Sequence, residues 1–151
     1  MRFFLDEQTV INANAQFWEQ MLAMTLEPLS RAEDFSAGAG HLLGAVTLAG
    51  AWSGRIEVRL SSALAYVATA AMMMQALDTV TEADALDATK EIANMIAGTI
   101  KSSLPRPSSM TVPESAVEAQ DFPSAAHAED SLVVAFRHPA GDLQVRIWER
   151  A

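Results

Sequence analysis

The 151-residue sequence contains no cysteine, and this absence excludes several kinds of chemistry. Without cysteine the chain cannot form disulfides, thiolate nucleophiles, cysteine-ligated zinc sites or iron–sulfur centres. Histidine is scarce as well: His41, His127 and His138 lie in separate segments without a nearby liganding partner. We therefore interpret each histidine as a surface or loop residue and expect no metal site.

Several familiar active-site motifs are missing too. The chain has no phosphate-binding P-loop, no zinc-protease helix motif and no serine-hydrolase elbow. Gly38, Gly40 and Gly44 form a glycine-rich stretch, but their spacing does not match the dinucleotide-binding fingerprint, and they precede an expected strand instead of following one. We interpret this stretch as a flexible loop.

Basic residues and long hydrophobic runs are both in short supply. Ten Lys and Arg oppose nineteen Asp and Glu, which gives a net charge of −9 and a pI near 4.6. This balance disfavours general binding to nucleic acids or to anionic membranes. The longest nearly apolar stretch, residues 63–74, is shorter than the roughly 20 residues that a membrane-spanning helix needs. We expect a soluble, cytoplasmic protein in which residues 1–151 form a single domain.

Two segments in the first half carry helical patterns. Between residues 6 and 26 apolar side chains recur at helical spacing, and Pro28 follows as a stop signal. The side chains expected to be buried there include Val10, Ala13, Phe17, Met21 and Met24. A second helix is expected after Ser61 and Ser62, which are suitable N-caps. Its expected inward side chains are Leu64, Val67, Ala68, Ala71, Met72 and Leu77. We interpret Met72–Met74 as core filling in preference to a soft binding groove.

Alternating apolar and polar residues predict a first hairpin. Residues 42–48 are mostly apolar, and residues 55–60 alternate with a period of two. Two glycines between these segments help the chain to turn. We expect an antiparallel pair with one face buried and with Arg55, Glu57 and Arg59 facing solvent.

A second hairpin is expected from residues 132–137 and 143–148, joined by a turn at 139–142. Residues 108–129 before it contain two prolines and several small polar residues, so we interpret them as mostly connection, with a short strand at 110–112. The order helix, hairpin, two helices, hairpin predicts an α+β fold: a largely antiparallel sheet with two long helices packed on it.

The third helix is expected over residues 82–103. Thr81 and Asp84 resemble a capping box at its start, and Pro105 and Pro107 end it. At 100° per residue its expected buried stripe consists of Ala85, Ala88, Ile92, Met95, Ile96 and Thr99, with Ile100 at the margin.

Another side of this helix carries a narrow strip formed by Asp87, Glu91, Asn94 and Gly98, which Lys101 continues. A charged helix face is most often solvent cover. However, Asn competes for backbone hydrogen bonds in a helix, and a glycine there costs about 1 kcal/mol relative to alanine. Two unfavourable residues on one strip indicate a purpose, without saying which one.

The stretch from Asp87 to Gly98, DATKEIANMIAG, resembles the signature helix of the CheC/CheX/FliY family of chemotaxis phosphatases. The family pattern has Asp or Ser, three residues, Glu, two residues and Asn, with a proline further along. The segment EIANMIAG is similar to the CheX form in particular, and the element order is similar over most of the chain. Pro113 stands a little early relative to the family's proline, so the chain departs from the pattern after the helix.

The resemblance implies a CheC-like fold and hydrolysis of the phospho-aspartate on a CheY-like response regulator, in chemotaxis or related two-component signalling. It implies that Asn94 orients the attacking water and that Glu91 docks the receiver's active-site lysine, with Asp87 and Gly98 as further partner contacts. Orienting a water resembles the part that glutamine plays in GTPases. The chain itself is expected to bind no cofactor, because the receiver domain brings its own Mg²⁺.

The resemblance also bears on the number of sites. Members of the CheC branch resemble a duplicated unit with two signature helices, but here Leu22 follows Glu19 where an asparagine is required. One site per chain is the CheX-like arrangement, which implies a homodimer with the sheet continued between subunits.

Two other interpretations stay open. A non-catalytic relative that binds receiver domains as an adaptor or phosphate sink would share every sequence feature except the need for Asn94 in turnover. An unrelated small-molecule-binding α+β domain would show an apolar pocket with convergent polar groups away from the third helix.

Overall fold

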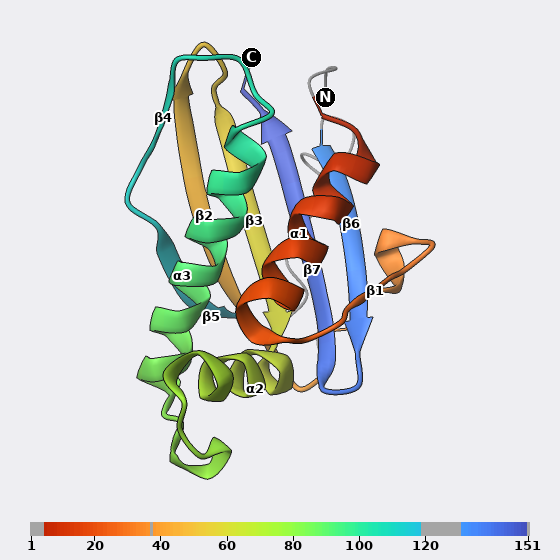
Figure 1. The fold of residues 1–151 in the computed structure, drawn as a ribbon, viewed down its shortest axis with the longest axis vertical. Helices are drawn as coiled ribbons and strands as arrows, with labels where there is room; N and C mark the ends of the chain where they lie inside the picture. Colours follow the sequence, from red (N-terminus) through yellow and green to blue (C-terminus); the bar gives the residue numbers. More distant parts are fainter. Residues whose placement is uncertain (1–4, 37, 119–130, 151) are drawn as a thin grey trace.

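The computed structural model describes residues 5–36, 38–118 and 131–150 (Figure 1). In chain order the elements are α1 (Glu7–Leu22), β1 (Glu27–Pro28), η1 (Ala32–Asp34), β2 (His41–Gly50), β3 (Gly54–Ser61), α2 (Ser62–Met73), η2 (Leu77–Thr79), α3 (Glu82–Lys101), β4 (Ser108–Met110), β5 (Glu114–Glu118), β6 (Ser131–His138) and β7 (Gly141–Glu149). The expected order of helices and hairpins is confirmed. The short strand expected at 110–112 lies instead at 108–110, as β4, and β1 and β5 are additional short strands.

The strands form one seven-stranded sheet in which every pairing is antiparallel. Its order is β1-β6-β7-β3-β2-β4, and β5 also pairs with β2, next to β4 along the same edge. In Figure 1, α1 and α3 lie along one face of the sheet and α2 crosses one end of it. The α+β fold with a largely antiparallel sheet is therefore confirmed.

The apolar core lies between this face and the helices. Alternate strand residues contribute buried side chains, among them Val46, Ile56, Val58, Phe136, Val145 and Ile147. From α1, the rings of Phe17 and Trp18 pack edge to face with centroids 5.4 Å apart. Burying a side chain of this size contributes about 1.5–3 kcal/mol, so the strand alternation and the helical periodicity together set which face each element buries.

The first helix is shorter than expected. It ends at Leu22 because Ala23 adopts the left-handed conformation (φ 53°) and its N–H caps the carbonyls of Trp18 and Glu19. The chain then continues to Glu27 and Pro28, which pair with the edge of β6. Met21, expected in the core, is 56% exposed because it lies in the last turn of this shortened helix.

The interpretation of Met72–Met74 as core filling is correct only for Met72. Met72 packs against the core, whereas Met73 and Met74 are exposed, and so are Ala71 and Leu77. Met74 lies in the left-handed conformation (φ 53°) that ends α2. Leu77 is therefore outside the helix, and the helical spacing that predicted its burial no longer applies.

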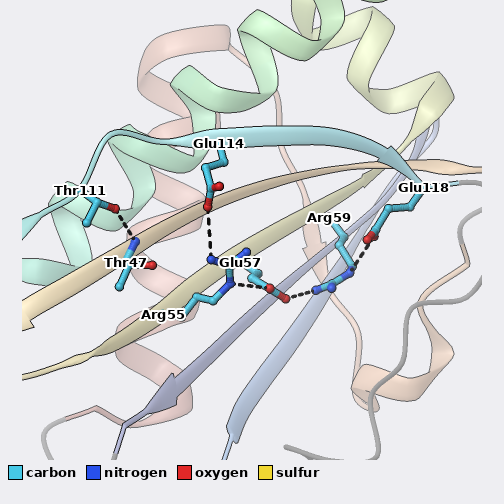
Figure 2. A network of polar contacts seen from close by, with 7 residues as sticks. All are labelled: Thr47, Arg55, Glu57, Arg59, Thr111, Glu114 and Glu118. Carbon is cyan, nitrogen blue, oxygen red and sulfur yellow. Dashed lines mark hydrogen bonds and ion pairs between the residues drawn. The ribbon is translucent and has the colours of Figure 1, made fainter.

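The charged side chains of β3 do not all face solvent. Glu57 and Arg59 are buried on the side of the sheet away from the helices, and only Arg55 keeps partial exposure. Figure 2 shows the reason: Glu57 bridges Arg55 (2.7 Å) and Arg59 (2.6 Å). Buried charges are tolerated when they are paired. This ladder of ion pairs therefore allows Glu57 and Arg59 to be buried, although the period-two pattern predicted that both face solvent.

The acidic ends of this ladder come from β5, in a region predicted from the sequence to be mostly connection. Glu114 approaches Arg55 (3.5 Å), and Glu118 approaches Arg59 (3.5 Å) and the ring Nε2 of His41 (2.7 Å). His41 is therefore a buried, paired residue and not a surface one. His138 is half-buried and its Nδ1 accepts a hydrogen bond from the Ala140 N–H, while His127 lies outside the described residues.

Within the described residues, no helix has the length and apolarity needed to cross a bilayer.

Gly44 lies in the middle of β2 and not in a flexible loop. A Cβ atom placed on it would stand 2.6 Å from the carbonyl oxygen of Thr89 and 2.9 Å from the Cβ of Ala93, both in α3. The helix therefore rests directly on the strand at this point, and the missing side chain sets the distance between them.

We predict that Gly44→Ala lowers the free energy of unfolding by about 1–3 kcal/mol, because the overpacking against α3 outweighs the gain in backbone entropy. Urea unfolding followed by circular dichroism measures the change. An unchanged midpoint would show that α3 can move away from β2 without loss, contrary to the packing described here.

Candidate functional site

The helix α3 carries the candidate site and begins at a complete capping box. The Asp84 N–H donates to the Thr81 hydroxyl (3.1 Å), and the Thr81 N–H donates to the Asp84 carboxylate (3.0 Å). The hydrogen bond from the Thr81 backbone lowers the pKa of Asp84. Because this folded-state pKa is lowered, the contribution of the cap is complete above the ordinary Asp pKa and is lost as the pH falls through the lowered value.

The buried face of α3 is wider than the expected stripe. It comprises Ala85, Ala88, Thr89, Ile92, Ala93, Ile96, Ala97 and Ile100. Thr99, expected to be buried, is exposed, and Met95 is half-buried. The helix contacts β2 and β3 beneath it and α1 and α2 beside it. These contacts on several sides explain why Ala93 and Ala97 are buried in addition to the expected stripe.

The strip predicted from the sequence lies on the opposite side of the helix, as a rotation of about 100° per residue requires. Asp87, Glu91 and Gly98 are exposed, and Asn94 is half-buried. The structure thus brings the four residues to one accessible face, with Lys101 half-buried at its end.

The two central side chains of this strip are available to another molecule. Among the residues that the structure describes, neither the Glu91 carboxylate nor the Asn94 carboxamide makes a hydrogen bond or an ion pair within the chain. Asp87 approaches only Lys90 (3.6 Å), in an exposed pair of small energetic value. Glu91 and Asn94 are one turn apart, about 5–6 Å between Cβ atoms, so one bound group can meet both.

Gly98 has a different character from Gly44. A Cβ built on Gly98 meets nothing within 4 Å, so no packing within the described chain requires a glycine there. A glycine weakens a helix interior, and at this position it leaves the helix backbone accessible from the outer surface.

A hollow of about 420 Å³ opens beside Gly98, at the C-terminal end of α3. It lies between Lys101 and Ser102 of the helix and the following residues 105–108. Lys101 was predicted from the sequence to continue the strip, but Arg106, between the two prolines that follow the helix, was not predicted. The only feature of the sequence that could have indicated Arg106 is its position between Pro105 and Pro107, directly after the helix.

Within the described residues, no group of three or more His, Asp or Glu side chains is arranged to hold a metal ion. The polar groups at the centre of the strip are a carboxylate, from Glu91, beside a carboxamide, from Asn94.

A family model described as "Chemotaxis phosphatase CheX" matches residues 42–137. No curated protein matches the sequence significantly. Among solved structures, the chemotaxis protein CheX from Vibrio vulnificus aligns with a TM-score of 0.76 at 14% identity, covering 99% of this chain and 100% of that one.

Two further solved structures show the same fold. The CheX of the CheX-CheY-BeF3-Mg²⁺ complex from Borrelia burgdorferi aligns with a TM-score of 0.68 at 18% identity, over 95% of this chain and 97% of that one. FliY from Thermotoga maritima aligns with a TM-score of 0.60 at 15% identity, over 97% and 92%.

We predict that Gly98→Ala raises the free energy of unfolding by about 0.5–1 kcal/mol, because the new methyl group meets open space and alanine favours the helix. The same urea titration that reports a loss for Gly44→Ala should report this gain. A destabilised Gly98→Ala protein would mean that the outer face of α3 is packed within the chain.

Proposed function

The chain belongs to the CheX family of chemotaxis phosphatases, and from this premise we propose that it hydrolyses the phospho-aspartate of a CheY-like receiver domain. The observation that carries the proposal is the pair Glu91 and Asn94, one turn apart on the outer face of α3 and unengaged within the described chain. The family match supports the class of activity, and the free pair supports its location.

The reaction asks little of this chain, because an acyl phosphate is already reactive. A water oxygen attacks the phosphorus, the bond from phosphorus to the aspartate carboxylate oxygen breaks, and inorganic phosphate leaves with the protons of the water. What this chain supplies is the in-line position of that water. The carboxamide oxygen of Asn94 accepts a hydrogen bond from the water and adds no negative charge beside the phosphoryl group.

Glu91 has a docking role in this proposal. A carboxylate beside a phosphoryl group is a poor base, since like charges repel, but it can pair with the receiver's active-site lysine and set the register of the two proteins. Asp87 adds a second polar contact on the same strip. Gly98 lets the receiver's loops approach the helix backbone.

The receiver supplies Mg²⁺ with its phosphoryl group in this proposal, so the chain itself binds no cofactor. A solved CheX structure from Borrelia burgdorferi contains CheY, BeF3 and Mg²⁺, which supports a CheY-like receiver as the partner class. The cytoplasm, where we expect the chain to act, remains a prediction.

We also propose a homodimer, with one site in each chain. Among the described strands, β4 and β5 pair only with β2, so their outer edge can accept a strand from a second copy. Val112 and Val117 are exposed along this edge, and their burial would favour such a pairing.

The structure offers little support for a small-molecule binder. A hollow of about 450 Å³ lies away from α3, beside the turn of the second hairpin. Its ionic groups do not converge on a ligand, because Arg137 and Asp142 pair with each other at 2.9 Å.

We predict that Asn94→Ala lowers kcat by roughly 10²-fold or more with little change in KM, because the water loses its positioning group. The assay is phosphate release from a Mg²⁺-loaded, phosphorylated receiver domain. The matched control is Asn12→Ala on the exposed face of α1, which should keep wild-type activity. If wild type binds phosphorylated receivers without accelerating phosphate release, the chain is an adaptor and the proposed hydrolysis is wrong.

Glu91→Ala should act on binding instead, raising KM about tenfold with a much smaller change in kcat, because a charge pair with the receiver is lost. Glu19→Ala, at an exposed position of α1, is the control for the loss of one carboxylate. A fall in kcat at constant KM would contradict the docking role and would indicate that Glu91 acts in the chemical step.

A further inference from the structure

Two cations stand together without an acidic partner at the end of the proposed site. In residues 5–36, 38–118 and 131–150, neither Lys101 nor Arg106 forms an ion pair. Five other cations of the described chain pair with acids, namely Arg31, Arg55, Arg59, Lys90 and Arg137. Since acids outnumber bases by nineteen to ten, two neighbouring unpaired cations are unexpected and call for a cause.

Both cations line the 420 Å³ hollow beside Gly98, and the hydroxyls of the two serines that also line it donate hydrogen bonds within the chain. The Ser102 hydroxyl donates to the Thr99 carbonyl (2.6 Å), and the Ser108 hydroxyl donates to the Pro105 carbonyl (2.8 Å). The side chains of the hollow with charge free for a ligand are therefore cationic.

Helix energetics explain only one of the two charges. Lys101 lies in the last turn of α3, where the helix dipole favours a cation. Arg106 lies beyond the helix, between Pro105 and Pro107, and gains nothing comparable. Bringing the two together in one hollow costs repulsion, which an anion bound between them would remove.

The hollow lies beside the strip but apart from Glu91 and Asn94. Gly98 belongs to both surfaces. Lys101 follows Asn94 by seven residues, which is roughly 10 Å along a helix with a rise of 1.5 Å per residue. At that separation the cations can contact receiver residues around a phosphoryl group held at Asn94, but they cannot contact the phosphoryl group itself.

We propose that this hollow receives an acidic side chain of the receiver domain, about 10 Å from the phospho-aspartate. The inference rests on the proposed function and adds a second docking point to it. The strip then presents acids (Asp87 and Glu91) at one end and bases (Lys101 and Arg106) at the other. A receiver with the complementary pattern binds in one direction along α3, and the reversed direction brings like charges together.

The test compares Lys101→Gln, Arg106→Gln and the double variant in receiver association and phosphate release. The double variant should lower the association rate and raise KM about tenfold, leave kcat unchanged, and weaken the dependence of both on ionic strength. Lys101→Arg should retain wild-type behaviour. Arg150→Gln is the matched control, because Arg150 also makes no ion pair in the described chain and lies outside the hollow.

A charge exchange identifies the occupant. Lys101→Glu with Arg106→Glu should prevent binding, and changing one exposed acidic residue near the receiver's phospho-aspartate to lysine should restore it. If no such receiver variant restores binding to the reversed pair, an acidic side chain is not the occupant of the hollow.

The outcomes separate this inference from the function on which it rests. If wild type neither binds nor dephosphorylates any receiver, both are wrong. If wild type is active but the double glutamine variant behaves like Arg150→Gln, the docking inference alone is overturned. A loss confined to kcat would place the two cations at the phosphoryl group and would also overturn it.

Discussion

The contact of α3 with β2 at Gly44 is the constraint on which the rest of the structure depends. The strand backbone and the carbonyl of Thr89 come so close that no side chain fits between them. This contact, together with the apolar side chains on either side of it, fixes the height and rotation of the helix. Because the rotation is fixed, Glu91 and Asn94 are held on the outer face. The geometry of the candidate site is thus decided in the core.

Two glycines illustrate how packing and function divide between the faces of one helix. Gly44 lies beneath α3 and is needed because the interior is close-packed there. Gly98 lies on the outer face, where a side chain would meet nothing of this chain. The first glycine contributes to stability, whereas the second weakens the helix, a cost that the proposed function explains by the approach of a receiver domain. Such a sacrifice of stability is common where a surface is used for binding.

Charge is also divided between the two sides of the sheet. On the side away from the helices, Glu57 joins Arg55 and Arg59 in a buried ladder (Figure 2), so those charges are used within the chain. On the helix side, Glu91 on the α3 strip and Lys101 and Arg106 at its end make no ion pair within the described chain. In the proposed function the partner is a CheY-like receiver domain, and the proposed placement of acids at one end of the strip and bases at the other sets the direction in which it binds.

The sequence by itself determined the element order, the two hairpins, the cap of α3 and the strip from Asp87 to Gly98, because these depend on local periodicity and capping. It did not reveal β5, the burial of Glu57 and Arg59, the exposure of Met73 and Met74, or the place of Arg106 beside Lys101. The first two of these depend on segments distant in the chain, and the last two depend on where α2 and α3 end. A charge becomes buried only when another strand brings its partner, and a methionine stays exposed when its helix ends early. Tertiary structure decided these features because pairing and packing partners are not encoded in local spacing.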